Sequence, residues 1–291
     1  MVVALCLLGF AACSEEEVLV NNELGKTVLR VALGPKDIIY DKEDEEFDIE
    51  KYVETLHIIG IDQNNERGID YEVDWDNAKK VQEGNDWYAE FTIDEIPGGV
   101  YTLYSVANAG DLDWQSKLTS TTVDAYTSGE QPDLFLMSAV DNARIDPNNP
   151  NNGATIELIR TVAKIGIGKI TMNGEEKTPT DYKINVSGKL YSTYPLFEAT
   201  NTSTGSEDIN KTSTNAPVYL SESNGPVNVT LTVTIDGKEY TGTLADGEED
   251  IVLKRNNYYA LNGTIDEQSQ CLLLNISVAP WEVVPLSPTY E

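Results

Sequence analysis

The chain has 291 residues, and its 49 acidic against 20 basic side chains give a formal net charge of −29 at pH 7. This charge opposes binding to nucleic acids and to anionic membrane surfaces, because both are negatively charged and would be repelled over a Debye length of about 8 Å. The length exceeds that of one typical domain and favours two domains, each with a core of its own.

The chain begins with a short apolar segment that ends in small residues and a cysteine. This segment is too short to span a bilayer, which takes roughly 20 apolar residues, and it fits the apolar region of a signal peptide. The pair Ala11-Ala12 before Cys13 resembles a lipobox, in which a signal peptidase cuts before a cysteine that carries diacylglycerol. We therefore expect a lipoprotein signal peptide at residues 1–12, lipidation at Cys13 and a tether at residues 13–22.

A serine and three glutamates follow the cysteine directly, at residues 14–17. This run resembles the export signal that carries Bacteroidetes lipoproteins to the outer leaflet. A solvated tether with no further role explains the run equally well, and both interpretations stay open. The expected location is the cell outer membrane, with the lipoprotein exposed on the surface.

Alternation of apolar and polar side chains with a period of two dominates the chain and predicts β-strands. The clearest case is residues 227–235, where valine, leucine and isoleucine alternate with asparagine and threonine. Asp236-Gly237 and a second alternating run at residues 238–244 follow at once, which predicts a β-hairpin. Further strands are predicted at residues 27–33, 53–61, 87–93, 100–107, 155–170, 182–190, 258–265 and 271–278.

Helical segments are expected only as a turn at residues 48–53 and a second short piece at residues 76–81. Many short strands separated by clusters of Gly, Pro, Asn and Asp are typical of antiparallel sandwiches and barrels. Arg160 and Lys164 alternate with apolar neighbours in one predicted strand, so we expect both side chains to face outward. The predicted fold class is all-β.

A polar segment separates two groups of predicted strands. Residues 146–153 contain two prolines and no large apolar side chain, so they can neither bury surface nor continue a ladder. We interpret them as the connection between an N-terminal β-sandwich at residues 23–150 and a C-terminal β-sandwich at residues 154–291. A long loop within one domain is the alternative. Residues 200–216, rich in Ser, Thr and Asn, are expected to form a mobile surface loop.

The chain carries none of the common catalytic constellations. Its one histidine, His57, lies in a predicted strand, where a structural role is favoured over that of a base beside a nucleophile. Outside the leader and the lipidation position, Cys271 is the one remaining cysteine, and its apolar neighbours indicate a buried, inert thiol. One histidine and one cysteine effectively exclude zinc, and the acidic residues at 41–48, Asp111 and Asp113 lack EF-hand spacing. We expect no metal, no cofactor and no enzymatic activity.

The four tryptophans are candidates for ligand contacts. Trp87 and Trp281 lie in or at the end of predicted strands, where packing in the core is the commoner role. Trp75 and Trp114 lie in polar loops and could stack against sugar rings if they are exposed. This gives an alternative function, a surface-exposed lipoprotein that binds glycans through these two side chains.

Four short strings occur in order along the chain. They are a proline-glycine turn with a tyrosine strand that ends in Ala-Asn, a Met-Ser pair with a later Leu-x-Arg-x-Val-Ala-Lys-Ile segment, an Arg-Asn-x-x-Tyr segment, and Val-x-Pro-Trp. They lie at residues 96–108, 136–138 with 157–165, 254–259 and 278–281. Taken together, they resemble the fimbrillins, the major and accessory subunits of Bacteroidetes type V pili.

The resemblance implies two transthyretin-like antiparallel β-sandwiches in tandem and assembly by donor-strand exchange. A protease trims the first strand of the lipoprotein precursor, and a strand of the next subunit fills the groove. The exchange has a physical basis, because an incomplete sandwich exposes unpaired N–H and C=O groups that an extended segment satisfies. The cut in the family follows an arginine, for which Arg30 is the nearest match. The candidate exchanged strand, at residues 27–33, contains Val28, Leu29, Val31 and Leu33.

The implied function is that of a structural subunit of a cell-surface pilus that supports adhesion. The expected partners are other pilus subunits, either copies of this chain or accessory fimbrillins, and the outer membrane through the lipid anchor. A host or bacterial surface ligand is a further expected partner. No nucleic-acid partner is expected, in keeping with the net charge of −29.

Overall fold

The computed structural model describes residues 24–35, 49–75, 78–83, 86–146, 153–197, 203–244 and 251–281. Over these residues the chain is almost entirely β, which confirms the predicted all-β fold class. Helical structure in these ranges is confined to short turns, such as the 3₁₀ turns Ile49–Lys51 and Leu118–Ser120, and no described helix has the length and hydropathy needed to cross a membrane. The strands are β1 (Leu24–Pro35), β2 (Leu56–Asp62), β3 (Arg67–Glu72), β4 (Lys79–Glu83), β5 (Asp86–Pro97), β6 (Gly99–Ala107), β7 (Thr122–Asp124), β8 (Met137–Ile145), β9 (Gly153–Ile156), β10 (Ile159–Arg160), β11 (Ala163–Met172), β12 (Glu175–Lys177), β13 (Asp181–Leu190), β14 (Thr193–Pro195), β15 (Glu207–Thr214), β16 (Val218–Leu220), β17 (Asn228–Ile235), β18 (Lys238–Leu244), β19 (Asn257–Asp266) and β20 (Cys271–Pro280).

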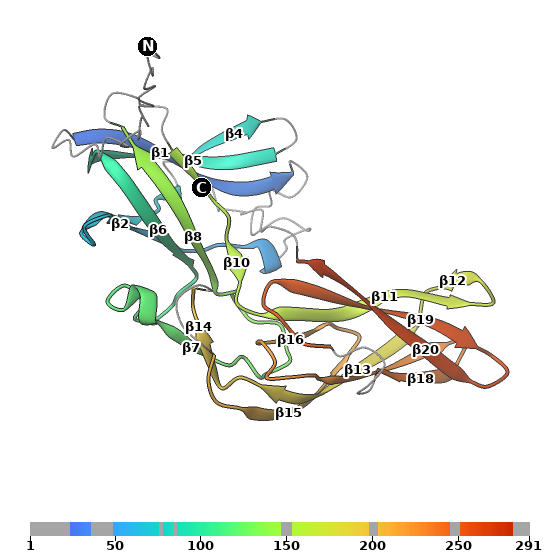
Figure 1. Ribbon diagram of the computed structural model, residues 1–291. Helices are drawn as coiled ribbons and strands as arrows, with labels where there is room; N and C mark the ends of the chain where they lie inside the picture. Colours follow the sequence, from blue (N-terminus) through green and yellow to red (C-terminus); the bar gives the residue numbers. More distant parts are fainter. Residues whose placement is uncertain are drawn as a thin grey trace, which may run out of the picture.

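Strands β1 to β6 and β8 to β10 form two sheets, with the strand orders β4-β5-β1-β9 and β10-β8-β6-β2-β3 (Figure 1). We call these two sheets the N-terminal sheet pair. They share a core that includes Leu29 of β1, Phe91 of β5 and Leu103 of β6, each at most 3% exposed. Burial of alternate side chains is what a period-two pattern predicts, and each such Leu or Phe contributes about 1.5–3 kcal/mol when fully buried.

One sheet of this pair is buried on both faces. Away from the shared core, β2 and β6 present Ile59 and Val106 to a second cluster that includes Trp114, Tyr194 and Phe197. These aromatic residues come from the loop after β6 and from the segment around β14, and β14 also pairs with β7. Segments that are distant in the sequence therefore cover the outer face of this sheet.

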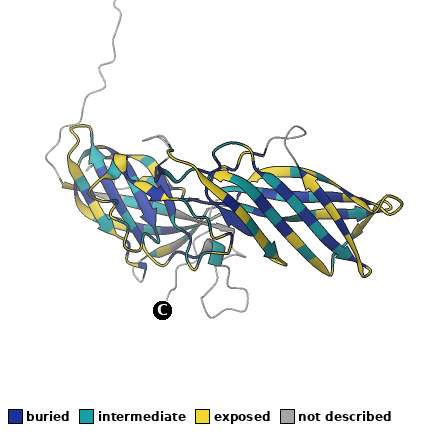
Figure 2. Cartoon of the chain, turned by 90° about the horizontal axis from the view of Figure 1, so that it is seen from below, coloured by how far each residue is buried: buried dark blue, intermediate teal, exposed yellow. Residues whose placement is uncertain are grey.

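The remaining long strands form a path in the order β12-β11-β19-β20-β18-β17-β13-β15, with β16 attached to β11. The path folds into two layers that meet between β20 and β18, where the two strands pair at a single position, Cys271 with Thr241. Buried apolar side chains, among them Val229, Leu231 and Leu261, fill the space between the layers. We call this unit the C-terminal sandwich, and Figure 2 shows how buried and less buried residues alternate along its strands.

The hairpin predicted from residue 227 to residue 244 is confirmed. β17 and β18 pair antiparallel without a register shift. The connecting residues Asp236 and Gly237 have φ angles of 51° and 74°. Type I′ turns need such left-handed values at both central positions, which Asp and Gly tolerate better than most residues.

Two predicted segments differ from the structure. The single strand predicted at residues 155–170 is divided into the end of β9, β10 and most of β11. β9 pairs with β1, β10 pairs with β8, and β11 pairs with β12, β16 and β19. The helix predicted at residues 76–81 is wrong from Lys79 on, where β4 begins and pairs with β5, and residues 76–77 lie outside the described residues. The turn predicted at residues 48–53 is confirmed as the 3₁₀ turn Ile49–Lys51.

The surface loop predicted at residues 200–216 is wrong for β15, which pairs with β13 along its whole length. Only Ile209 of β15 is buried, so this edge strand has no hydrophobic alternation that could reveal it. Polar contacts hold it instead. Asn185 Nδ2 of β13 donates to Asn210 Oδ1 at 2.8 Å and to Thr212 Oγ1 at 2.9 Å.

Residues 147–152, most of the predicted connection between two domains, lie outside the described residues. The strands that follow still belong to the N-terminal sheet pair, since β9 pairs parallel with β1 and β10 pairs antiparallel with β8. Ile156 and Leu158 lie in its core. The chain enters the C-terminal sandwich at β11, and the division into domains at residues 23–150 and 154–291 stays a prediction.

Asp141 of β8 is a half-buried carboxylate whose Oδ2 atom has no hydrogen-bond partner within the described parts of the chain. Burial, reinforced by the negative charge of Glu157, raises the pKa of Asp141 to about 6. Between about pH 4 and this value, the folded chain holds a proton that the unfolded chain releases. The free energy of unfolding therefore falls as the pH rises through this range.

We predict that Asp141→Asn raises the free energy of unfolding at pH 7.5 by about 1 kcal/mol, because solvent screens part of the effect, and has little effect near pH 3.5. Chemical denaturation at the two pH values measures this difference. Asp111→Asn is the matched control, because it removes the same charge from an exposed position after β6. Equal gains from both substitutions at pH 7.5 would contradict the role assigned to Asp141.

Candidate functional site

The strand predicted at residues 27–33 is confirmed as part of β1, which has a neighbour on each side. β1 pairs antiparallel with β5 along its length and parallel with β9 from Val28 to Val31. Leu29 is fully buried in the core, and Val28 is half-buried. Val31 and Leu33 belong to the strand, but their side chains lie outside the described residues. β1 is therefore an interior strand of its sheet.

Arg30 lies in the doubly paired part of β1. Its partners in the register are Glu90 on β5 and Thr155 on β9. Its Nε atom also donates to Glu90 Oε2 at 3.1 Å. A protease binds an extended segment through the backbone groups of that segment, and those of β1 around Arg30 are already paired with β5 and β9. A protease therefore reaches the bond after Arg30 only when β1 has left the sheet.

The close approach of β9 to β1 depends on a glycine. A Cβ atom at Gly153 would lie 2.0 Å from the backbone oxygen of Val28. This distance is far inside van der Waals contact, so any larger residue would push the two strands apart. The predicted connection thus ends in the residue type that the pairing with β1 requires.

A buried ionic cluster joins the N-terminal sheet pair to the C-terminal sandwich. The carboxylate of Glu50, in the turn before β2, accepts hydrogen bonds from Lys164 Nζ of β11 at 2.6 and 2.8 Å. It also accepts a hydrogen bond from the hydroxyl of Tyr219 of β16. The side chains of Lys164 and Glu50 are only 20% and 13% exposed, so loss of one partner would leave a poorly solvated charge.

Arg160 completes this cluster from β10. It is only 1% exposed, its Nε donates to the backbone oxygen of Glu50 at 2.9 Å, and its guanidinium carbon lies 4.3 Å from the ring centre of Trp281. Lys164 Nζ lies 5.5 Å from the same ring. The prediction that Arg160 and Lys164 face outward is wrong, because a carbonyl, a carboxylate and aromatic faces replace water around both cations. We call Glu50, Arg160, Lys164, Tyr219 and Trp281 the Glu50 cluster.

A second buried arginine, Arg255, precedes β19. Its guanidinium forms a two-pronged ion pair with Glu222, with Nε–Oε1 and Nη2–Oε2 distances of 2.9 and 3.3 Å. It also donates to the backbone oxygen of Pro195 at 2.8 Å and lies 4.9 Å from the ring centre of Tyr194. These contacts tie the turn before β19 to β14, which covers the outer face of the N-terminal sheet pair.

Asn108, at the end of β6, holds three backbone segments together. Its Oδ1 accepts from the N–H groups of Glu54 and Thr55 at 2.9 and 3.3 Å. Its Nδ2 donates to the carbonyls of Tyr52 and Phe135 at 3.1 and 3.0 Å. The backbone of Asn108 has a φ of 55°, a left-handed value that asparagine tolerates better than most residues.

The strings found in the sequence meet in these contacts. The string at residues 157–165 supplies Arg160 and Lys164, the last string supplies Trp281, and the third supplies Arg255. Glu50 and Tyr219 lie in none of the strings and were missed by sequence reasoning. Their partners are distant, since 114 positions separate Glu50 from Lys164 and 169 separate it from Tyr219. No local pattern carries that information.

Neither of the tryptophans considered for sugar stacking is exposed. Trp114 and Trp75 are 1% and 9% exposed. Trp114 packs edge-on against His57 and Phe197, and Trp75 packs edge-on against Phe91. The exposure that sugar stacking requires is not met, because the polar segments that carry the two rings fold back onto the sheets. The glycan-binding alternative thereby loses the two side chains on which it was built.

His57 occupies a structural position on β2. Its Nε2 lies 2.6 Å from Asp70 Oδ1 of β3, and its Nδ1 lies 3.0 Å from Gln115 Nε2 in the loop after β6. Trp281, as predicted, packs in the core and is 7% exposed. The side chain of Trp87 lies outside the described residues.

The expectation of a buried thiol at Cys271 is wrong. The residue begins β20 on the face that looks to solvent, and its side chain is exposed. Of the acidic residues considered for calcium, those at 41–48 lie outside the described residues, and Asp113 accepts hydrogen bonds from Ser116 Oγ. Within the described parts of the chain, no three His, Cys, Asp or Glu side chains gather as a metal site. Cys13 and residues 1–22 also lie outside the described residues.

Solved structures of similar fold include fimbrial and adhesion proteins. A fimbrial assembly protein from Parabacteroides distasonis is 16% identical, with a TM-score of 0.55, 87% of this chain covered and 99% of that one. A putative cell adhesion protein from Bacteroides uniformis is 15% identical, with a TM-score of 0.53 and coverages of 89% and 98%. The tip fimbrial protein Mfa3 from Porphyromonas gingivalis is 15% identical, with a TM-score of 0.50 and coverages of 88% and 100%. The fold is thus that of a fimbrial β-sandwich protein.

The sequence gives a narrower assignment. Residues 47–285 match the family of fimbrillin-A associated anchor proteins Mfa1 and Mfa2. The chain therefore belongs to this family, which confirms the resemblance to the fimbrillins and assigns the protein to the fimbria-associated proteins of the cell surface. No curated protein shows a significant match to the sequence.

The Glu50 cluster predicts unequal costs for two lysines on one strand. Lys164→Met leaves the Glu50 carboxylate without its cation and should lower the free energy of unfolding by about 2 kcal/mol or more. Lys169→Met, on the same strand, breaks an exposed pair with Glu176 of 3.1 Å and should cost about 0–1 kcal/mol. Denaturant titration measures both.

A double substitution separates the charge effect from packing. Lys164→Met combined with Glu50→Gln removes both charges, so it should be less destabilising than the sum of the two single changes. Additive losses in this cycle would show that the two side chains do not act as a buried ion pair.

Proposed function

We propose that this protein is a structural subunit of a cell-surface fimbrium, that a lipid on Cys13 anchors its precursor in the outer membrane, and that cleavage of β1 then lets it join its neighbours by strand exchange. The observation that carries the proposal is the match of residues 47–285 to fimbrial anchor proteins. The partners are other fimbrial subunits, of the same or of an accessory kind. Similar folds described as putative cell adhesion proteins support a role in adhesion to a host or bacterial surface ligand.

The lipid anchor is supported by the residues around Cys13. The small pair Ala11-Ala12 precedes it, and a short apolar segment precedes the pair. Diacylglycerol adds two acyl chains, and two hydrophobic signals are what stable anchoring requires. Residues 14–23 connect the cysteine to β1 and can span at most roughly 35 Å, which limits how far the folded part can lie from the membrane.

Strand exchange is supported by the position of β1 between β5 and β9. Loss of β1 would free a backbone edge on each of these strands and empty the space that Leu29 fills. An extended segment with an apolar side chain at that position satisfies both requirements. Cleavage after Arg30 is the trigger that we propose. It divides β1 into residues 24–30 and 31–35, and each piece is held by fewer backbone pairings than the intact strand.

The lipid anchor predicts a modified N-terminal peptide. Mass spectrometry of the protein from outer-membrane fractions should find the peptide that begins at Cys13 with the added mass of the lipid. Cys13→Ala should lower the amount in this fraction by about tenfold. Cys271→Ala is the matched control and should change nothing. An unmodified N-terminal peptide on membrane-associated protein would exclude this anchor.

Strand exchange predicts that a covalent lock on β1 blocks assembly. In a Cys271→Ser background, the substitutions Val28→Cys and Thr92→Cys place two thiols opposite each other on β1 and β5. After treatment with an arginine-specific protease, the reduced protein should lose residues 13–30 and enter SDS-resistant complexes with fimbrial subunits. The oxidised protein should retain them and stay out of such complexes.

The control lock lies in the β17–β18 hairpin. Thr230 and Thr243 have hydroxyls 3.0 Å apart, so Thr230→Cys with Thr243→Cys forms a matched disulfide away from β1. This variant should assemble equally well in both redox states. If the β1 lock also assembles equally well when oxidised, β1 is not the exchanged strand.

A further inference from the structure

β20 of the C-terminal sandwich has one paired edge and one open edge. It pairs with β19 along its whole length but with β18 only at Cys271, and no other strand in the described part of the chain pairs with it. Residues 271–279 contain neither a charged residue nor a proline. Native edge strands are usually protected by lysine, proline or a bulge, because an uncharged apolar edge is a template for another strand. β20 has no such protection before Pro280.

The inner face of β20 becomes uncovered towards the end of the strand. Leu272, Leu274, Ile276 and Val278 point to the same side, because side chains alternate along a strand. Leu272 is 4% exposed, the next two are half-buried, and Val278 is 53% exposed. On the neighbouring strand β19, Tyr259 stays at 3%. The apolar core therefore extends along β19 as far as Tyr259, whereas the β20 side chains beside it become exposed to solvent.

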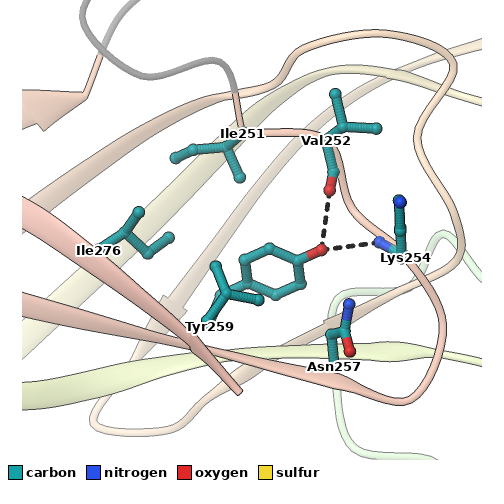
Figure 3. Close-up of a pocket in the computed structure, with 7 residues that line it drawn as sticks. Ile251, Val252, Lys254, Asn257, Tyr259 and Ile276 are labelled. Atoms are coloured by element: carbon teal, nitrogen blue, oxygen red, sulfur yellow. Dashed lines mark hydrogen bonds between the residues drawn. The ribbon is translucent and has the colours of Figure 1, made fainter. Parts of the chain in front are cut away.

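A groove lies along this open edge (Figure 3). Ile276 and Val278 line it from β20, Val252 and Lys254 line it from the segment before β19, and the ring of Tyr259 lies between them. The hydroxyl of Tyr259 donates to the backbone oxygen of Val252 and accepts from the N–H of Lys254, both at 2.8 Å. These two hydrogen bonds hold the segment that contains Val252 and Lys254 in place opposite β20. We call this pocket the β20 groove.

We propose that the β20 groove binds an extended segment of a different protein chain, which adds as a strand to the free edge of β20. The backbone of the segment would pair with β20, and its alternate branched side chains would cover Val252 and Val278, which are 40% and 53% exposed. Among the described residues that line the groove, Lys254 is the one that carries a charge, in a chain with a net charge of −29. It selects a segment that carries an acidic residue at this position.

The C-terminal residues of the chain itself are a poorer occupant. Residues 282–291 lie outside the described residues and contain Pro285 and Pro288. In an extended segment, positions three apart face opposite edges, so one of the two prolines always meets β20 without an N–H group. A foreign segment without proline pairs without this interruption.

The test uses the full-length protein in detergent and the acetylated, amidated hexapeptide Thr-Glu-Thr-Val-Thr-Val, in which the glutamate and the valines face the same side. Calorimetric titration should show saturable binding, and a peptide with proline in place of the first valine should bind at least about tenfold more weakly. Val278→Lys should weaken the binding of the first peptide by a similar factor. Leu273→Lys is the matched control, because Leu273 is 64% exposed on the other face of the same strand. It should leave binding unchanged.

A charge reversal tests the role of Lys254. Lys254→Glu should weaken the binding of the glutamate peptide and strengthen the binding of a peptide with lysine in place of the glutamate. Thermal unfolding of each variant checks that the C-terminal sandwich remains folded. Because these substitutions lie outside β1, a negative result here leaves the proposal for strand exchange at β1 intact.

Three outcomes would overturn the proposal. The first is no binding at millimolar peptide, or equal losses from Val278→Lys and Leu273→Lys. The second is binding that appears only after residues 282–291 are removed, which would make the tail of the chain the occupant. The third is a dimer without peptide that Val278→Lys dissociates in sedimentation experiments, which would make a second copy the occupant.

Discussion

The carboxylate of Glu50 constrains how the two halves of the molecule meet. A charge with so little access to solvent needs partners, and they come from β11 through Lys164 and from β16 through Tyr219. A buried charge left without its partner costs about 3–5 kcal/mol, whereas each cation–π contact on Trp281 contributes about 1–2 kcal/mol. The penalty for a wrong arrangement is thus larger than the gain from any single contact. The cluster therefore specifies the position of the C-terminal sandwich more than it adds stability.

The described contacts of the Glu50 cluster, which join the two halves of the molecule, do not involve β1. Tyr219 and Trp281 enter the core of the N-terminal sheet pair, while Trp114 and Phe197 cover the opposite face of β2 and β6. The sheet β10-β8-β6-β2-β3 is therefore packed on both sides. β1 contributes Leu29 to the shared core, and none of its described side chains belongs to the Glu50 cluster or to the cluster around Trp114. The proposed exchange of β1 would therefore leave the junction assembled.

The sequence predicts the parts of the fold whose signals are local. The alternation of β17 and β18 and the Asp236-Gly237 turn act within a few residues, so the hairpin is predicted correctly. β15 escapes prediction because its neighbour β13 holds it through polar side chains. The prediction for Arg160 and Lys164 is wrong because a local pattern assigns every charged side chain to solvent, whereas the partners of these two lie about a hundred positions away in the sequence. The family strings identify the right segments for the junction, but they do not reveal Glu50 or what the segments contact.

The bond after Arg30 separates the proposed lipid on Cys13 from the rest of the fold. While this bond is intact, tension on the lipid enters the molecule along β1, where the pairings with β5 and β9 share the load in shear. Once it is cut, only the backbone pairings of residues 24–30 and the burial of Leu29 connect the lipid to the sheets. The subunit can therefore be covalently anchored or cleaved, but not both. In the proposed function the lipid therefore holds the precursor, and the pairing of β1 with β5 and β9 delays the cut after Arg30 until β1 leaves the sheet.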